Sequence, residues 1–255
     1  YRGVAILNQM EAHFNISDSD PGKDGQVVQP IVPLSQDPGS QLAASTMSKW
    51  SEEVYSILSK SNVNKFRKVP ANYVILRGAS QYQNLRSFKE KYGFSGAVIA
   101  ASPVVKGICR ALEMDIVNVI GASGDLQSNL RDKTLAALEA LRNHNFVVLH
   151  ILGTDYVSHL KKADIKRGFL DKLDREVFTR IREYVDAEKT IIAVTSDHDS
   201  STQSGEHEHG AFPFAIYTKG IKPNEAAAFD EISCKEPLGP QTPMQNFMEI
   251  LMKYV

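Results

Sequence analysis

The sequence predicts an α/β fold, in which helices cover both faces of a mainly parallel sheet. From about residue 70 onward, short apolar runs alternate with amphipathic segments. A turn at residues 121–124 ends one of the apolar runs. Strands buried on both faces are nearly continuous apolar runs, and parallel strands need crossover connections that are usually helical. The alternation therefore favours a parallel sheet.

The beginning of the chain is predicted to contain fewer regular elements. Residues 4–7 are apolar and predict a strand, whereas residues 15–48 are rich in turn-forming residues and predict loops. A helix is predicted over residues 45–61, because apolar residues recur there on one helical face. That face comprises Met47, Trp50, Val54, Ile57 and Leu58.

The rest of the chain supplies the alternating elements. Apolar runs predict strands over residues 73–76, 97–100, 116–120, 146–152, 190–195 and 212–217. Amphipathic patterns predict helices over residues 81–91, 129–142, 164–187 and 243–254. A capping Ser102 followed by Pro103 predicts the start of a further helix. In the helix at 129–142 we expect the apolar face to contain Leu130, Leu135, Leu138 and Leu141.

The composition argues against several classes of protein. The net charge of −1 offers no broad electrostatic field for nucleic acid or a membrane surface. No apolar run approaches the roughly 20 residues that span a bilayer. Cys109 and Cys234 form no C-x-x-C motif, which argues against a disulfide scaffold or zinc ribbon. We therefore expect a cytoplasmic protein of one large or two small domains, with its oligomeric state left open.

Candidate metal ligands follow the predicted strand at residues 146–152. Asp155 and His159 are four residues apart, so on a helix they share a face and can bind one ion. The alternative is an Asp–His pair that only supports the start of a helix.

A second candidate pair, Asp197 and His198, follows the predicted strand at 190–195. Adjacent residues beyond a strand end diverge, so they suit two neighbouring ions better than one. The alternative is an ordinary solvated turn. Farther along, His207 and His209 flank Glu208, and the alternative there is a surface loop of mixed charge.

The clustering of these histidines favours a metal site over the separate alternatives. Four of the seven histidines fall within residues 155–159 and 197–209. Strands of an α/β sheet deliver side chains from their carboxyl ends to a common crevice. Carboxylates and imidazoles gathered there predict two divalent ions, such as Mn²⁺ or Zn²⁺.

Three other residues are considered for roles around this site. His150 lies inside a predicted strand, and we expect it to be a satisfied core histidine or a support for the ligands. Arg77 and Lys106 lie at a strand end or in the first turns of a helix, where either could meet an anion. The alternative for both cations is simple solvation.

Several stretches resemble the archaeal-type 2,3-bisphosphoglycerate-independent phosphoglycerate mutases of the alkaline phosphatase superfamily. They follow the family order from about residue 15 to the end of the chain. The matching stretches are residues 15–21, 70–78, 105–108, 119–124, 150–159 and 196–198, with His207 followed six positions later by Pro213. The resemblance implies an alkaline-phosphatase-like α/β domain with part of an inserted α+β lid domain. It implies that residues 1–100 belong to this substrate-binding lid and residues 101–255 to the metal-binding domain.

The resemblance also implies roles for the candidate residues. Two divalent ions, Mn, Zn or Mg, are expected. Asp155, His159 and His207 would hold one ion, and Asp197 and His198 the other, with His209 as the alternative to His207. Arg77 and Lys106 would bind the phosphate or carboxylate of a small phosphorylated metabolite, phosphoglycerate. A phosphoserine intermediate would carry the phosphoryl group between the 3- and 2-positions.

The chain departs from the family pattern in two places. We find no candidate for the nucleophilic Ser and its accompanying metal-binding Asp, which in the family precede the inserted domain. We therefore expect the nucleophile in an N-terminal segment absent from this sequence, and this chain alone to be inactive; the alternative is a pseudoenzyme. Ala211 and Phe212 replace the usual Pro-Val, which leaves open another metal-dependent phosphohydrolase or phosphomutase.

Overall fold

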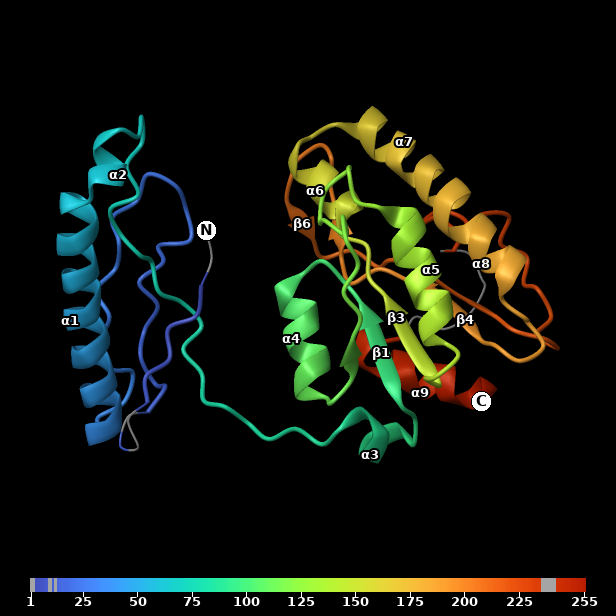
Figure 1. Ribbon diagram of the computed structural model, residues 1–255, viewed down its shortest axis with the longest axis horizontal. Helices are drawn as coiled ribbons and strands as arrows, with labels where there is room; N and C mark the ends of the chain where they lie inside the picture. Colours follow the sequence, from blue (N-terminus) through green and yellow to red (C-terminus); the bar gives the residue numbers. More distant parts are fainter. Residues whose placement is uncertain (1–2, 9–10, 12, 235–241) are drawn as a thin grey trace. The chain divides into compact units, whose positions relative to one another are not determined.

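The structure, a computed structural model, contains two compact units, Tyr1–Asn84 and Leu85–Val255 (Figure 1). It describes residues 3–8, 11, 13–234 and 242–255. This division falls at residues 84 and 85, and the domain boundary expected at residue 100 stays a prediction. Strand β1, Gly96–Ile99, pairs along its whole length with β3, Phe146–Leu149, and so belongs to the second unit. The role of the first unit as a substrate-binding lid stays a prediction.

Helix α1, Pro38–Lys60, dominates the first unit and covers the predicted helix at 45–61 except for its last residue, Ser61, which caps the helix end. It begins earlier than expected because Asp37 caps it. The Asp37 side chain accepts a hydrogen bond from the Ser40 amide at 2.8 Å, and Pro38 occupies the first helical position. A short helix α2, Asn62–Lys65, follows.

The strands predicted at residues 4–7 and 73–76 are wrong, since neither stretch is a strand. Val4 is 89% exposed, so no packed layer covers its side of the chain. Leu76 instead forms hydrogen bonds with Ser19. The Leu76 carbonyl accepts from the Ser19 amide and the Leu76 amide donates to Ser19 Oγ, both at 2.8 Å. An apolar run forms a strand only where a pairing partner and a covered face exist.

The second unit is built on a parallel sheet of three strands in the order β2-β1-β3. The outer strand β2 covers only Asp115–Ile116, shorter than the predicted 116–120. The sheet and its helices confirm the α/β class.

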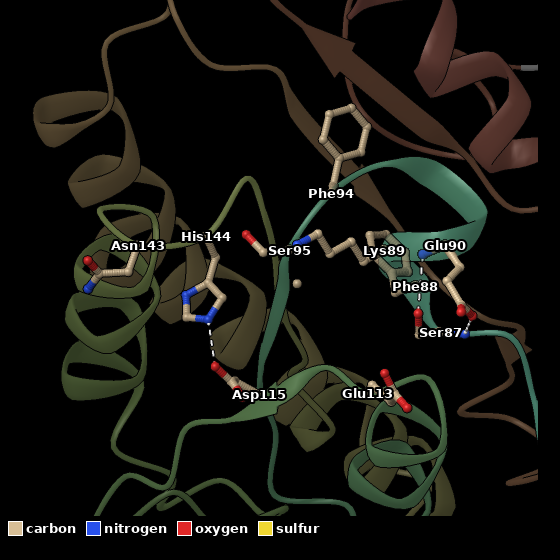
Figure 2. A pocket seen from close by; sticks show the side chains of 11 residues that line it. Ser87, Phe88, Lys89, Glu90, Phe94, Ser95, Glu113, Asp115, Asn143 and His144 are labelled. Atoms are coloured by element: carbon tan, nitrogen blue, oxygen red, sulfur yellow. Dashed lines mark hydrogen bonds and ion pairs between the residues drawn. The ribbon is translucent and has the colours of Figure 1, made fainter.

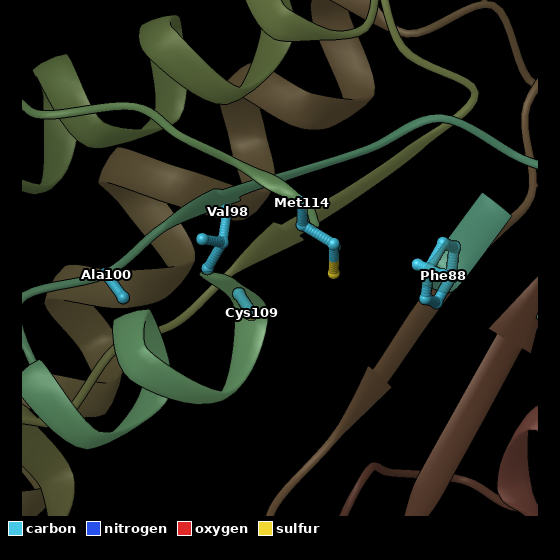
Figure 3. Packing of buried hydrophobic residues seen from close by; sticks show 5 residues of the cluster. All are labelled: Phe88, Val98, Ala100, Cys109 and Met114. Atoms are coloured by element: carbon cyan, nitrogen blue, oxygen red, sulfur yellow. The ribbon is translucent and has the colours of Figure 1, made fainter. Parts of the chain in front are cut away.

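Helices cover both faces of this sheet. Val98 packs toward Cys109 of helix α4, Pro103–Ala111, in a cluster shown in Figure 3. Its neighbour Ile99 faces the opposite side, where Ala137 of α5, Leu130–Ala140, packs against it. Successive strand residues point to opposite faces, so burial of four consecutive residues requires this double cover.

The helix starts follow local capping signals. Ser102 caps α4 as predicted, accepting from the Val105 amide at 3.5 Å. The helix predicted at 81–91 is reduced to α3, Phe88–Tyr92, because the capping box of Ser87 and Glu90 fixes its start.

Helix α5 is rotated relative to its predicted apolar face. Leu135 is 40% exposed, whereas small residues and a lysine occupy the covered side. The buried residues are Leu130, Lys133, Thr134, Ala137 and Ala140. Small side chains let the helix approach the sheet closely. The size of the side chains, more than their hydrophobicity, therefore determines which face of α5 is buried.

The predicted helix at 164–187 is a continuous helical segment in three pieces. Helix α7, Ala163–Leu173, passes through a π-helical turn, Asp174–Phe178, into α8, Thr179–Tyr184. Its buried residues Phe169, Leu173 and Val177 recur every four positions and pack against Leu130. A shorter helix α6, Gly153–His159, precedes it.

The last part of the unit contains two antiparallel pairs. Strand β4, Ile192–Thr195, pairs with β7, Phe214–Tyr217, and β5, Asp199–Ser200, pairs with β6, His207–Glu208. The β5–β6 pair was not predicted. The terminal helical segment consists of α9, Phe247–Leu251, between 3₁₀ turns at Met244–Asn246 and Met252–Tyr254. Within the described residues, no helix combines the length and apolarity needed to cross a membrane.

Candidate metal centre

Helix α6 presents Asp155 and His159 just beyond the carboxyl end of β3. They lie on one helical face, with Asp155 Oδ1 3.4 Å from His159 Nε2. Gly153 opens the helix under the ring of Phe169, where a Cβ would lie 2.6 Å from Phe169 Cε1. Close packing against α7 therefore fixes where the helix starts and where its two polar side chains lie.

The β5–β6 hairpin brings His207 to the same place. Its Nε2 lies 3.1 Å from Asp155 Oδ1. The hairpin closes through Gly205, which has a positive φ of +75° that L side chains rarely adopt. A Cβ there would also lie 2.7 Å from Lys161 Cε, so glycine meets both requirements of this turn.

The turn also orients His159. His159 Nδ1 lies 2.8 Å from the carbonyl oxygen of Gly205. A carbonyl only accepts, so Nδ1 carries the hydrogen and the lone pair of neutral imidazole is on Nε2, the atom nearest Asp155. Such a bond on the far nitrogen is a common support of metal-binding histidines.

The ligand atoms of Asp155, His159 and His207 fit a divalent ion. They lie within 4.8 Å of one another. One carboxylate and two imidazoles form a donor set suited to Zn²⁺ or Mn²⁺, and three protein ligands leave a position for a reacting group. Side-chain exposures of 23% for Asp155 and 50% for His207 leave the group open to solvent.

His198 lies directly beside this group. Its ring stacks on that of His207 with centroids 3.8 Å apart, and its Nε2 lies 3.6 Å from Asp197 Oδ1. Ser200, nearly buried, joins the two sets: its hydroxyl donates to Asp155 Oδ1 at 3.1 Å and lies 3.0 Å from His198 Nδ1. The sequence did not single out Ser200.

The other candidate residues are not among the three grouped ligands. His209 is exposed, two positions beyond His207. Lys106 donates to Asn118 Oδ1 at 2.9 Å. Arg77 belongs to the first unit, where its guanidinium pairs with Asp20 at 3.5 Å.

Two basic residues meet beside the carboxyl end of β3: Lys133, which belongs to α5, and His150, which follows the strand. The sequence did not single out Lys133. Lys133 is 1% exposed, and its Nζ donates to the His150 carbonyl at 2.6 Å. Burial and nearby Lys106 lower the pKa of Lys133 to about 8. His150 was expected to be satisfied, but its buried Nδ1 has no partner among the described residues. Burial, together with Lys133, lowers the pKa of His150.

A surface hollow lies at the opposite edge of the sheet, where the strands begin. It measures about 490 Å³, and Glu113, Asp115 and His144 are among its lining residues (Figure 2). Ligands of open α/β sheets bind at the carboxyl ends of the strands, so this hollow is not the expected place for chemistry. The metal-ligand group lies instead in an open position beyond β3.

A family comparison decides the membership of this chain. Residues 9–237 match the model of the metalloenzyme superfamily. This chain belongs to the metalloenzyme superfamily. Membership implies dependence on divalent metal, in agreement with the donor set of Asp155, His159 and His207.

Relatives within this metalloenzyme superfamily carry a narrower name. A 2,3-bisphosphoglycerate-independent phosphoglycerate mutase from Methanopyrus kandleri is 32% identical over 91% of this chain. One from Methanococcus vannielii is 31% identical over 99%. The chain spans only 56% and 63% of the lengths of these two curated relatives.

Solved structures agree with the metalloenzyme fold. The cofactor-independent phosphoglycerate mutase from Thermoplasma acidophilum is 30% identical, with a TM-score of 0.59 over 96% of this chain and 60% of that one. A protein from Pyrococcus horikoshii gives a TM-score of 0.72 at 30% identity, over 77% of this chain and 53% of its own.

Proposed function

We propose that this chain forms the metal-binding part of a 2,3-bisphosphoglycerate-independent phosphoglycerate mutase, which interconverts 3- and 2-phosphoglycerate. The observation that carries the proposal is the convergence of Asp155, His159 and His207 beyond the end of β3. The names of the relatives supply the reaction class.

In this proposal the chain provides most ligands of a two-metal site. Asp155, His159 and His207 hold one ion, and Asp197 with His198 contributes to the other, the ions being Mn²⁺, Zn²⁺ or Mg²⁺. Bound divalent ions would neutralise phosphoryl oxygens and lower the pKa of a serine hydroxyl. No residue of this chain is assigned as that serine.

The chain's own residues prepare the ligands for this task. The Gly205 carbonyl holds His159 in the tautomer with a free Nε2, and the Ser200 hydroxyl holds Oδ1 of Asp155. Arg77 and Lys106 are the candidates for binding the phosphate and carboxylate of the substrate. The first unit is proposed to be part of the substrate-binding lid.

The test is an activity assay on the complete gene product that contains these residues. Conversion of 3-phosphoglycerate to 2-phosphoglycerate should stop with a chelator and return with Mn²⁺. Asp155→Asn should abolish it without lowering the midpoint of thermal unfolding of the metal-free protein. Asp171→Asn, an exposed carboxylate on α7, serves as the matched control and should keep full activity.

The assay separates the competing functions. Release of inorganic phosphate to water, with no 2-phosphoglycerate formed, would replace the mutase by a phosphohydrolase. Metal binding without turnover of either kind would indicate a pseudoenzyme. An active Asp155→Asn variant with unchanged metal content would refute the site.

A further inference from the structure

A second surface hollow lies between α4 and the end of β2. It measures about 340 Å³ and is lined by Pro103, Lys106, Gly107, Arg110, Ile116 and Asn118. Unlike the hollow in Figure 2, it has no carboxylate in its lining. Its position at the end of β2 is on the sheet edge where open α/β folds bind ligands.

Within the part of the chain that the structure describes, the two cations of this hollow have no acidic partner. Among the described residues, neither Lys106 nor Arg110 forms an ion pair, although ten other pairs are found. Lys106 is held by the neutral Asn118 side chain at 2.9 Å. Arg110 keeps the planar set of donors that matches carboxylate and phosphate oxygens.

A third positive charge lies behind the hollow. Lys133 is buried and close enough to Lys106 for the two charges to repel, and its Nζ donates to the neutral carbonyl of His150. Lysine is almost never fully buried without a balancing charge. The same edge also holds the unpartnered Nδ1 of His150. Lys106, Arg110 and Lys133 thus gather positive charge here, and among the described residues none of the three forms an ion pair.

We propose that this hollow is an oxyanion-binding site in which Lys106 and Arg110 contact the ligand, while Lys133 adds a buried positive charge behind it. The ligand group is a phosphate monoester or a carboxylate. Its assignment to phosphoglycerate rests on the proposed function, whereas the binding of an oxyanion does not. Arg110, which the sequence did not single out, is the new binding residue.

The test measures the dissociation constants of inorganic phosphate and of D-glycerate by calorimetry on metal-free protein, so that bound ions take no part. Arg110→Met and Lys106→Met should each weaken binding about tenfold or more, because a charge-assisted hydrogen bond is lost. Arg131→Met, which removes an exposed arginine on α5, is the matched control and should bind like the unaltered protein.

Each outcome decides the proposal. If the variants lose only phosphate binding, the hollow binds the phosphate group. If they lose only D-glycerate binding, the hollow binds the carboxylate. Either result supports the proposal. Equal binding by Arg110→Met and Arg131→Met, or no binding of either anion to unaltered protein, overturns it. Mutase activity separates the two proposals. If the protein binds both anions normally but lacks mutase activity, only the proposed function is refuted. If the enzyme is active and the Arg110 and Lys106 variants bind the anions like the unaltered protein, only the oxyanion-binding site is refuted.

Discussion

His207 Nε2 lies 3.1 Å from Asp155 Oδ1, although 52 residues separate them along the chain. The contact exists because α6 follows directly on β3 and the β5–β6 hairpin folds its second strand toward that helix. It also distinguishes the two histidines that flank Glu208. Only His207 joins Asp155 and His159 within ligand distance among the described residues.

Replacing each of these histidines by alanine should give opposite results. We expect His207→Ala to lose one bound divalent ion per chain, because it removes one of three converging ligand atoms. His209→Ala should keep the ion, since its side chain lies outside the group. Metal content after dialysis, measured by mass spectrometry, checks this pair. Loss of metal in His209→Ala with retention in His207→Ala would reverse the ligand assignment.

Ser200→Ala should weaken metal binding without removing a ligand. Its hydroxyl holds Asp155 Oδ1 and contacts His198 Nδ1, and loss of such supporting bonds typically costs about 10- to 100-fold in metal affinity. Titration with Mn²⁺ or Zn²⁺ measures the affinity. Ser196→Ala, at an exposed serine of the same segment, is the control. An affinity unchanged in both variants would rule out this role for Ser200.

The elements that were predicted well from the sequence are those whose signals lie within a few neighbouring residues. Strand β1 lies within one residue of the predicted 97–100 and Ser102 caps the next helix, because an apolar run and a capping side chain act within a few neighbouring positions. The apolar run at 73–76 failed because its pattern does not reveal whether anything packs on it. Burial depends on partners distant in sequence.

The candidate site divides in the same way. Asp155 and His159 could be paired from their spacing on one helix, since an i, i+4 relation is local. The hairpin that supplies His207 has strands of only two residues and no alternating pattern, so Gly205 within a polar stretch was its one signal. The burial of Lys133 could not be predicted, because it follows from how α5 packs on the sheet.

The free energy of unfolding should fall as the pH rises above 6.5, because His144 loses its proton there. Its Nε2 bonds to Asp115 at 2.9 Å (Figure 2). Its Nδ1 bonds to the Ala140 carbonyl at 3.0 Å, and the two bonds together favour a ring with two N–H donors. These bonds raise the pKa of His144 above its ordinary 6.5 in the folded protein. The stabilisation is therefore fully present below pH 6.5 and lost as the pH rises through the folded pKa.

Urea unfolding of metal-free protein on either side of that window measures this effect. His144→Gln keeps a hydrogen-bonding side chain but cannot take up a proton, so it should flatten the slope of unfolding free energy against pH. The same slope in both proteins would show that His144 does not contribute.

Two glycines, one at the start of α6 and one inside α7, should respond oppositely to alanine. At Gly153 the new Cβ would collide with Phe169, at 2.6 Å from Cε1, so Gly153→Ala should destabilise the fold by about 1–3 kcal/mol through overpacking. At Gly168 nothing lies within 4 Å of the new Cβ, so Gly168→Ala should stabilise it by about 0.5–1 kcal/mol through helix propensity. Urea unfolding gives both values.

Since α6 carries Asp155 and His159, Gly153→Ala should also weaken metal binding, whereas Gly168→Ala should not. Equal stability of the two variants would mean that Phe169 moves aside freely and does not fix the helix.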